Sequence, residues 1–301
     1  MYKLFSEIAG EKNVFFNEPM KKHTTFRIGG AADCFIKCNS ERVALNVARY
    51  CDEKNIPIFI MGNGSNLLIG DLGIRGVVLQ LDDFFNECEF DDKECKVNAK
   101  SGILLSKLAS LAAKHNMSGL ECLSGIPGTL GGALYMNAGA YGDEIANYVE
   151  SVTYIDENST VKTFNLCECE FGYRKSVFTD SKKIILSAVL KLKPDTEEII
   201  RNRMAEYTEK RVSKQPVEKF SAGSTFKRPE GNYAGTLIEK SGLKGKKIGG
   251  AEVSEKHAGF IINNGDASAS DVIDLIKYVQ DKVYSDSQIL LEPEVKIVGD
   301  F

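Results

Sequence analysis

Two glycine-rich stretches and one serine-bearing basic segment are the parts of this 301-residue sequence whose residue types could do chemistry. The first stretch, Gly62-Asn63-Gly64-Ser65-Asn66, directly follows an apolar run. Consecutive small residues leave backbone N–H groups free to point at one anion, and glycine permits the positive φ angles that such a nest needs. Ser65 and Asn66 add side-chain donors. An ordinary turn between strands has the same composition, so both interpretations stay open for this loop alone.

The first stretch begins like the dinucleotide fingerprint GxGxxG, but Leu67 stands where the third glycine belongs. The residues that follow, LLIGDLGIRG, are typical of strand and turn and lack a helical repeat. Because the fingerprint requires a helix at this point, we do not expect a Rossmann unit. An NAD-dependent dehydrogenase of that fold is therefore disfavoured.

The second stretch runs from Ser124 to Gly142 and is also rich in glycine. Glycine lets backbone approach a flat ligand closely, while Pro127 limits the freedom of the segment. A flexible linker is the alternative, but the apolar Ile126 and Leu130 argue against it because linkers are polar. Two such loops predict a ligand with a diphosphate and a large planar part, a description that fits both FAD and NAD.

The basic segment Ser221–Arg228 places Ser224 next to two cationic side chains. A serine there could donate a proton or bind an anion, and the fork of Arg174 elsewhere in the chain suits a carboxylate. Glu294 begins the apolar run EVKIV, with Glu292 two residues earlier. Taken alone, these residues also match a solvated turn, a surface arginine and a carboxylate at the end of a strand.

The elements that must position these residues are mixed helices and strands in segregated units, so the sequence predicts an α+β protein. Ser40 precedes an apolar repeat of period four and is expected to cap a helix. Ser270 is expected to cap a late helix, and Pro194 to end a strand before a charged helix. The predicted strands are 34–38, 57–61, 76–81, 94–99, a hairpin over 149–164, 183–192 and 294–298, and the predicted helices follow Ser40, span 104–112 and 195–210, and follow Ser270.

Composition excludes several classes of function. The formal net charge of −4 disfavours a nucleic-acid binder, which needs a broad basic field. No apolar run reaches about 18 residues and residues 1–11 lack an apolar signal core, so we expect a cytoplasmic protein without membrane partners. The eight cysteines form no CxxC pair, so we expect reduced thiols and no metal site.

Five motifs occur in a familiar order: GNGSNLLIGDLGIRG, SGIPGTLGGALYMNAGAYGDE, FGYRKSVF, SAGSTFKRPEG and LEPEV. With these motifs the chain resembles the UDP-N-acetylenolpyruvoylglucosamine reductase family over nearly its whole length. The short run between Arg174 and Lys183 resembles the type II subgroup, which lacks an extra substrate-capping loop.

The resemblance implies a two-subdomain FAD-binding fold of the vanillyl-alcohol-oxidase (PCMH) type plus a C-terminal α+β substrate domain. The expected divisions are residues 1–75, joined by a returning strand at 290–301, then 76–193, and a substrate domain at 194–289. FAD is expected to be bound non-covalently, since neither loop contains a histidine or cysteine. The expected FAD-binding residues are Met61, Gly62, Asn63, Gly64, Ser65, Asn66, Ser124, Gly125, Pro127, Gly128, Thr129, Gly132, Asn137, Ala138 and Gly139.

The resemblance also implies the reaction, an NADPH-dependent reduction of the enolpyruvyl ether of UDP-N-acetylenolpyruvoylglucosamine to UDP-N-acetylmuramate. Hydride is expected to pass from flavin N5 to the vinyl carbon, and the proton to come from Ser224. Arg174 is expected to stabilise the enolate, and Glu294, preferred over Glu292, to assist the charged intermediate. Such a protein serves peptidoglycan synthesis, and hence cell wall biogenesis, cell shape and cell division.

A cluster of cations is expected to bind the anionic substrate of this net-negative chain. Many family members have asparagine at position 228, where this chain has arginine, so the contact made there is open. We expect the protein to be a monomer. The expected substrate-binding residues are Tyr141, Tyr173, Arg211, Lys214, Lys227, Arg228, Lys244 and His257.

Two other functions fit parts of the sequence. Another FAD oxidase of the same fold would use molecular oxygen and would not need a cationic cluster over residues 211–257. A non-catalytic nucleotide-sugar-binding protein would keep that cluster but would not need a proton donor at Ser224 or an acid at Glu294.

Overall fold

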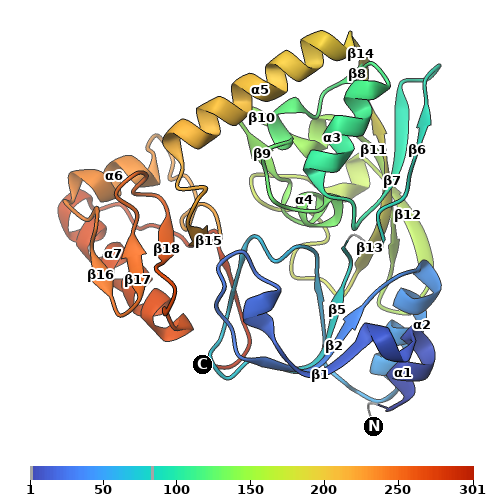
Figure 1. The fold of residues 1–301 in the computed structure, drawn as a ribbon, viewed down its shortest axis with the longest axis horizontal. Helices are drawn as coiled ribbons and strands as arrows, with labels where there is room; N and C mark the ends of the chain where they lie inside the picture. Colours follow the sequence, from blue (N-terminus) through green and yellow to red (C-terminus); the bar gives the residue numbers. More distant parts are fainter. Residues whose placement is uncertain (1–2, 83–84) are drawn as a thin grey trace. The chain divides into compact units, whose positions relative to one another are not determined.

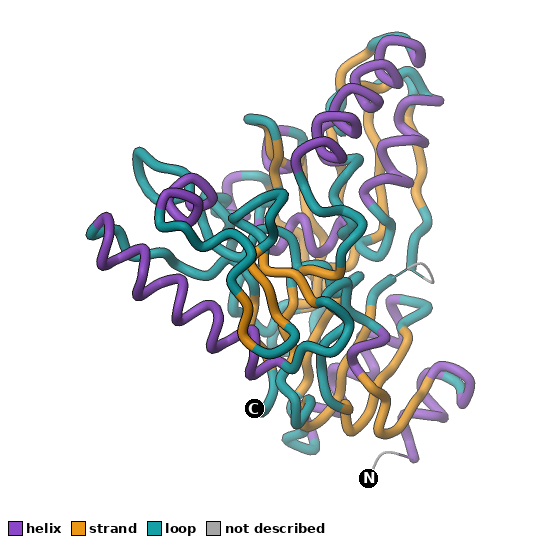
Figure 2. The backbone as a smooth tube through the Cα atoms, turned by 60° about the vertical axis from the view of Figure 1, so that its left-hand side comes forward, coloured by secondary structure: helices purple, strands orange, loops and turns teal. Residues whose placement is uncertain are grey.

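The computed structural model describes residues 3–82 and 85–301, and these fall into two compact units. Unit 1 comprises residues up to 15, then 34–63 and 76–210; unit 2 comprises residues 16–33, 64–75 and 211–301. The chain passes between them within β1 (Val14–Pro19), β2 (Ala31–Lys37), β5 (Ile74–Gln80) and α5 (Glu197–Lys214), and within the first glycine-rich loop. Figure 2 shows helix, strand and loop mixed along the tube, in agreement with the α+β class.

Unit 1 contains a five-stranded sheet of order β12-β11-β13-β7-β6, in which every pair of neighbouring strands is antiparallel. Strands β11 and β12 form the predicted hairpin, which turns at residues 156–160. Strand β13 pairs with β11 on one side and β7 on the other. Helices α3 and α4 pack against it (Figure 1). The bounds are β6 Cys88–Asp91, β7 Lys96–Lys100, β11 Val149–Ile155, β12 Val161–Asn165, β13 Ile184–Lys191, α3 Leu105–Lys114 and α4 Leu130–Met136.

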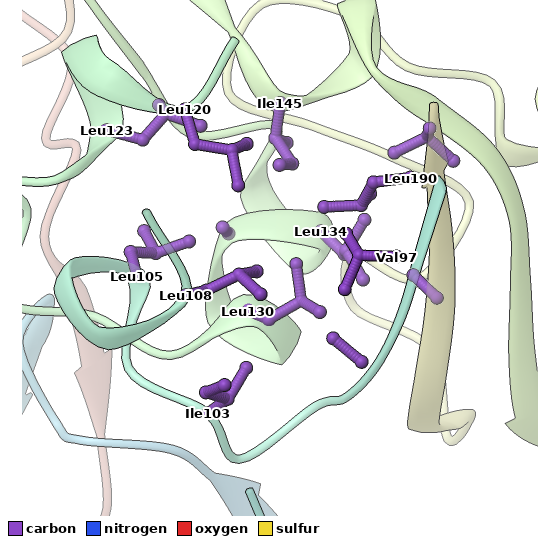
Figure 3. Packing of buried hydrophobic residues seen from close by; sticks show 14 of the residues in the cluster. Val97, Ile103, Leu105, Leu108, Leu120, Leu123, Leu130, Leu134, Ile145 and Leu190 are labelled. Carbon is purple, nitrogen blue, oxygen red and sulfur yellow. The ribbon is translucent and has the colours of Figure 1, made fainter. Parts of the chain in front are cut away.

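The core under these helices is mostly aliphatic and is buried. Leu105 and Leu108 of α3 meet Leu130 and Leu134 of α4, together with Val97 of the sheet, as Figure 3 shows. Each buried leucine contributes on the order of 2 kcal/mol of hydrophobic stabilisation. This core holds α4 in place, and α4 carries part of the second glycine-rich stretch.

A second sheet has the order β1-β2-β5-β3, and its strand β3 (Ile58–Met61) runs parallel to β5. Helix α2 (Glu41–Glu53) begins as predicted, because the Ser40 hydroxyl accepts a hydrogen bond from Val43 N at 3.3 Å. With α1 (Lys3–Ala9), it buries a separate apolar cluster against β2 and β5. This packing fixes the position of β3, whose last residue, Met61, directly precedes the first glycine-rich loop.

Unit 2 has its own core. Helices α6 (Ala234–Lys240) and α7 (Ala269–Ser287) pack on a sheet of order β15-β18-β17-β16. A parallel pair joins β4 (Leu67–Ile69) to β19 (Lys296–Val298), so the closing strand returns to the segment after the first glycine-rich loop. The sheet strands are β15 Phe220–Ser221, β16 Lys247–Ile248, β17 Ala251–Val253 and β18 Ile261–Asn263.

The remaining elements are short. They are β8 Met117–Ser118, which pairs with β14 Lys193–Pro194, the hairpin of β9 Gly139–Ala140 and β10 Asp143–Glu144, and 3-10 turns at Glu11–Asn13, Met20–Lys22, Glu121–Leu123, Ile145–Asn147 and Cys167–Cys169. None of the helices in the described part of the chain is both long enough and apolar enough to cross a membrane.

Several predicted boundaries differ from the structure by a few residues, and two of the errors have a clear physical cause. The cap of α7 is Ser268, with Asp271 completing a reciprocal capping box, whereas Ser270 lies inside the helix and donates to Asp71. The closing strand begins at Lys296 and not at Glu294, because the N–H of Glu294 bonds to Thr225 O instead of a strand neighbour.

Candidate active site

The first glycine-rich loop follows β3 and precedes β4. Gly64 has φ +63°, a value that glycine adopts without strain. Within residues 3–82 and 85–301, the backbone N–H groups of Asn63, Gly64 and Ser65 donate to no protein acceptor. Three successive donors of this kind suit a phosphate oxygen. A strand and not a helix follows Gly64, so the expected absence of a Rossmann turn is confirmed.

The second stretch meets the first inside unit 1. Asn63 Nδ2 donates to Pro127 O at 2.6 Å. A Cβ atom on Gly62 would lie 2.2 Å from Thr129 Oγ1, so only glycine allows the two segments to approach this closely. Thr129 is the cap of α4, where its hydroxyl accepts a hydrogen bond from Gly132 N at 3.3 Å. Within unit 1, the start of the first loop is therefore packed against the second stretch.

The C-terminal end of the second stretch contains buried residues. Asn137 is 0% exposed, and its carboxamide donates to Gly172 O and accepts from Ala146 N. Both polar atoms of its side chain thus have a protein partner, and FAD binding by Asn137 stays a prediction. Ala138 is buried, and Gly139 begins the β9–β10 hairpin.

Arg174 lies in a two-residue turn of unit 1. Gly172 and Lys175 exchange main-chain hydrogen bonds of 3.0 and 3.2 Å around it. The Arg174 guanidinium donates to Gly139 O at 3.2 Å and lies over the Tyr173 ring at 5.1 Å. The backbone of Arg174 has φ +55°, a left-handed conformation that is uncommon outside glycine and often marks functional positions.

Tyr141 is also held in a left-handed conformation, with φ +57°, at the tip of the β9–β10 hairpin. Its ring stacks on Tyr207 of α5 at a centroid distance of 4.9 Å, and its hydroxyl donates to Tyr207 O at 3.3 Å. Tyr141 remains 45% exposed, so one side of the ring is accessible to a ligand.

In unit 2, the segment bearing Ser224 is paired with the segment bearing Glu294. Thr225 O accepts hydrogen bonds from Glu294 N at 2.7 Å and Val295 N at 3.4 Å, and Lys227 N donates to Glu292 O at 2.8 Å. Asn66 Nδ2 donates to Glu294 O at 3.2 Å. The structure therefore brings together the Ser224 segment, Glu294 and the end of the first glycine-rich loop.

Thr225 is a residue that the sequence did not single out. Its N–H donates to Gly259 O at 2.9 Å, and its hydroxyl accepts from Ile261 N at 3.0 Å. These bonds join the Ser224 segment to the strand after His257. Its place in the motif SAGSTFKRPEG was the only sequence signal for this structural role, because the residues that Thr225 contacts are all distant in sequence.

The expected substrate cations of unit 2 differ in their surroundings. Lys227 pairs with Glu292 at 3.2 Å and Lys244 with Glu239 at 2.8 Å, so a ligand there would compete with a carboxylate. Arg228 lies over the Tyr233 ring at 4.1 Å. Arg211 and Lys214 occupy the last turn of α5.

His257 is positioned by its own turn. Its Nδ1 accepts a hydrogen bond from Gly259 N at 3.1 Å, which leaves Nε2 to carry the proton of the neutral ring. Burial, together with the charge of Lys244, lowers the pKa of His257 below its ordinary value. At neutral pH this side chain is therefore an uncharged donor and not a cation.

The predicted site residues thus form two assemblies. Unit 1 holds the end of β3, the second glycine-rich stretch, Tyr141 and the Arg174 turn, whereas unit 2 holds the end of the first loop, Ser224, Glu294 and the substrate cations. Among the described residues, no three His, Cys, Asp or Glu side chains come together as metal ligands would.

Two protein-family models match parts of this chain. An FAD binding domain family matches residues 32–165, and the C-terminal domain family of UDP-N-acetylenolpyruvoylglucosamine reductase matches residues 215–298. The chain is 47% identical to the UDP-N-acetylenolpyruvoylglucosamine reductase of Clostridioides difficile over 97% of this chain and 96% of that protein.

Solved structures give the same answer. The crystal structure of UDP-N-acetylenolpyruvylglucosamine reductase from Thermus caldophilus matches with a TM-score of 0.80 and 35% identity, covering 93% of this chain and 97% of the other. The 4-ethylphenol oxidase from Gulosibacter chungangensis shares the fold alone, with a TM-score of 0.50, 17% identity and coverage of 63% and 41%. The predicted FAD-binding fold with a further C-terminal domain is thereby confirmed, and the chain belongs to the UDP-N-acetylenolpyruvoylglucosamine reductase family.

Proposed function

We propose that this protein reduces the enolpyruvyl ether of UDP-N-acetylenolpyruvoylglucosamine to UDP-N-acetylmuramate, with FAD as bound cofactor and NADPH as reductant. The proposal rests on family membership and on one observation, the main-chain pairing that places the Ser224–Thr225 segment beside Glu294 and Asn66. The protein is an FAD-dependent oxidoreductase of peptidoglycan synthesis. We further propose that it acts as a monomer in the cytoplasm, without a membrane or nucleic-acid partner, in support of cell shape and division.

The glycine-rich loops fit FAD. The unpartnered N–H groups of Asn63, Gly64 and Ser65 suit the diphosphate, and the close contact of Gly62 with Thr129 keeps the second stretch against the first. We propose that Met61–Asn66 and Ser124–Gly139 hold the cofactor non-covalently. When bound, FAD supplies the hydride that reaches the vinyl carbon of the substrate.

The residues of this chain handle the charge and the proton. Hydride addition to the terminal vinyl carbon leaves negative charge on the α carbon, shared with its carboxylate. Arg174 stabilises that charge, since its planar fork suits a carboxylate. The Ser224 hydroxyl gives its proton to the α carbon, which completes the reduction, and Glu294 assists the charged intermediate.

The remaining polar residues are proposed to bind the diphosphate and the sugar of the substrate. We propose contacts from Tyr141 and Tyr173, and from the cationic set of Arg211, Lys214, Lys227, Arg228 and Lys244, with the neutral His257 as a hydrogen-bond donor. We also propose the functional division into residues 1–75 with 290–301, 76–193 and 194–289. The pairing of β19 with β4 supports the return of the last strand.

The experiment is a steady-state assay of NADPH oxidation with purified yellow protein, with and without the enolpyruvyl substrate. We expect oxidation to depend on the substrate, and Ser224→Ala to lower kcat by about 10²–10⁴-fold while flavin stays bound. Full turnover by Ser224→Ala would refute the assignment of the proton donor. Oxygen uptake with an alcohol, independent of NADPH, would instead favour an oxidase of the same fold.

Acid denaturation separates covalent from non-covalent flavin. We expect the yellow colour to leave the precipitated chain and remain in solution. Flavin that stays with the precipitate would refute the non-covalent assignment.

A further inference from the structure

Asn137 is the C-cap of α4, where a left-handed conformation is common, and its side chain is fully buried. Its φ is +46°, in the left-handed region that asparagine tolerates better than most residues. The side chain is 0% exposed, so each of its polar atoms needs a protein partner. Nδ2 donates to Gly172 O at 3.0 Å, and Oδ1 accepts from Ala146 N at 3.2 Å.

The acceptor Gly172 opens the tight turn that bears Arg174. Because Gly172 and Lys175 bond to each other in both directions, the turn moves as one piece with Gly172. The hydrogen bond from Asn137, which lies 35 residues earlier in the chain, therefore restrains the whole turn.

The guanidinium of Arg174 has a second support that also depends on Asn137. It donates to Gly139 O at 3.2 Å, and Gly139 follows Asn137 by two residues. The side chain of Asn137 therefore fixes the base of the turn, while its main chain leads directly to the carbonyl that orients the guanidinium. Nearby, the Ser176 and Thr179 hydroxyls donate to Tyr135 O at 2.8 and 2.7 Å, which joins the rest of this loop to the same end of α4.

We propose that Asn137 is the positioning residue of Arg174. It touches neither substrate nor cofactor with its side chain, and it sets where the guanidinium meets the developing charge. This inference rests on the function proposed above for Arg174. A misplacement of about 1 Å at a reacting group can cost about 10²-fold in rate, so a single buried hydrogen bond is enough to matter.

The test is Asn137→Asp, followed in the two half-reactions separately. Aspartate keeps the shape, the tolerance for φ +46° and the acceptor for Ala146 N, but it places an oxygen against Gly172 O. In anaerobic stopped-flow, we expect reduction of bound flavin by NADPH to slow far less than reoxidation, because the change alters the side chain of Asn137 and leaves the main chain of the cofactor-holding stretch in place. We expect reoxidation of the flavin by the enolpyruvyl substrate to slow by about 10–100-fold.

A double-mutant cycle with Arg174→Ala identifies the route of the effect. If Asn137 acts through Arg174, Asn137→Asp costs little further rate once the guanidinium is gone. Asn13→Asp is the matched control, because Asn13 is also buried in unit 1, at 6% exposure, and also donates to a main-chain carbonyl, Ala9 O at 2.8 Å. We expect this control to reoxidise at the rate of the unmodified protein.

The outcomes are distinct. Rapid reoxidation by Asn137→Asp, additive losses with Arg174→Ala, or equal slowing by Asn13→Asp would each overturn the inference. If Asn137→Asp does not fold, Asn137→Ser, which shortens the side chain without adding charge, takes its place with the same expected pattern. If the unmodified protein itself is not reoxidised by the substrate, the proposed function fails, and this inference fails with it.

Discussion

Replacing Gly62 by alanine tests whether the start of the first glycine-rich stretch is held against the second by close packing on Thr129. The added Cβ would lie 2.2 Å from Thr129 Oγ1, whereas ordinary contact begins at 3.4 Å. The Gly62 backbone does not have the positive φ that disfavours side chains, so the effect is steric and not conformational. Relief requires Thr129 to retreat by about 1.2 Å, which breaks its capping bond to Gly132 N.

The magnitude follows from these contacts. Overpacking costs about 1–3 kcal/mol, and loss of a threonine cap about 0.5–2 kcal/mol. In Gly62→Ala/Thr129→Ala the offending hydroxyl is absent, and the closest atom left is the Thr129 Cβ position at 3.3 Å, which small shifts can accommodate. We therefore expect the double variant to unfold at nearly the same urea concentration as Thr129→Ala alone, and Gly62→Ala to bind FAD more weakly than the double variant.

Urea denaturation of the cofactor-free protein and titration with FAD, followed by quenching of flavin fluorescence, measure both effects. Gly132→Ala is the control for stability, because its Cβ would meet Thr129 Oγ1 at an ordinary 3.6 Å and it lies in a helix where alanine is favoured. If the losses from Gly62→Ala and Thr129→Ala simply add, the contact between the two loops is not the cause.

Three further results are expected. Because burial lowers the pKa of His257 from 6.5, the unfolded chain takes up this proton first as the pH falls, so the free energy of unfolding should decrease below about pH 6.5; His257→Gln should flatten that decrease in pH-dependent urea denaturation. Asp71→Ala should cost about 1–2 kcal/mol in the same measurement, because its carboxylate accepts two main-chain N–H bonds at the start of α7, and an equal stability would contradict this role. Cys167 is exposed, whereas burial raises the pKa of Cys51 and Cys122 to about 12, so a thiol reagent at neutral pH should modify Cys167 well before these two, as peptide mass spectrometry would report.

Local signals in the sequence predicted most of the elements. The helix capped by Ser40, the hairpin before β13 and the strand character after Gly64 are each encoded within about ten residues, so their patterns could be interpreted directly. The error at α7 has the opposite origin. Ser270 is a good cap by type, but Asp71, from 198 residues away, takes the first N–H groups of the helix, and Ser268 completes the cap.

The site shows the same division. Residue types and motif order predicted the loops, Arg174, Ser224 and Glu294 as site residues, but not the bonds that hold them. These bonds and contacts join segments that are distant in sequence. They are the hydrogen bond from Asn137 to Gly172, the close packing of Gly62 on Thr129 and the main-chain bonds of Thr225. The preference for Glu294 over Glu292 came from the motif, and the structure adds that Glu292 is engaged with Lys227.

The parallel pairing of β19 with β4 bears on how the protein is made. Chains emerge from the ribosome N-terminal end first, so β4 is synthesised long before the strand that completes it. Until β19 appears, the backbone donors and acceptors on that side of β4 are an open edge, the kind of template on which nascent chains aggregate. The short length of β4, three residues between the glycine-rich loop and Gly70, limits that hazard during translation. The segment that follows the first glycine-rich loop is therefore completed only after β19 has been synthesised.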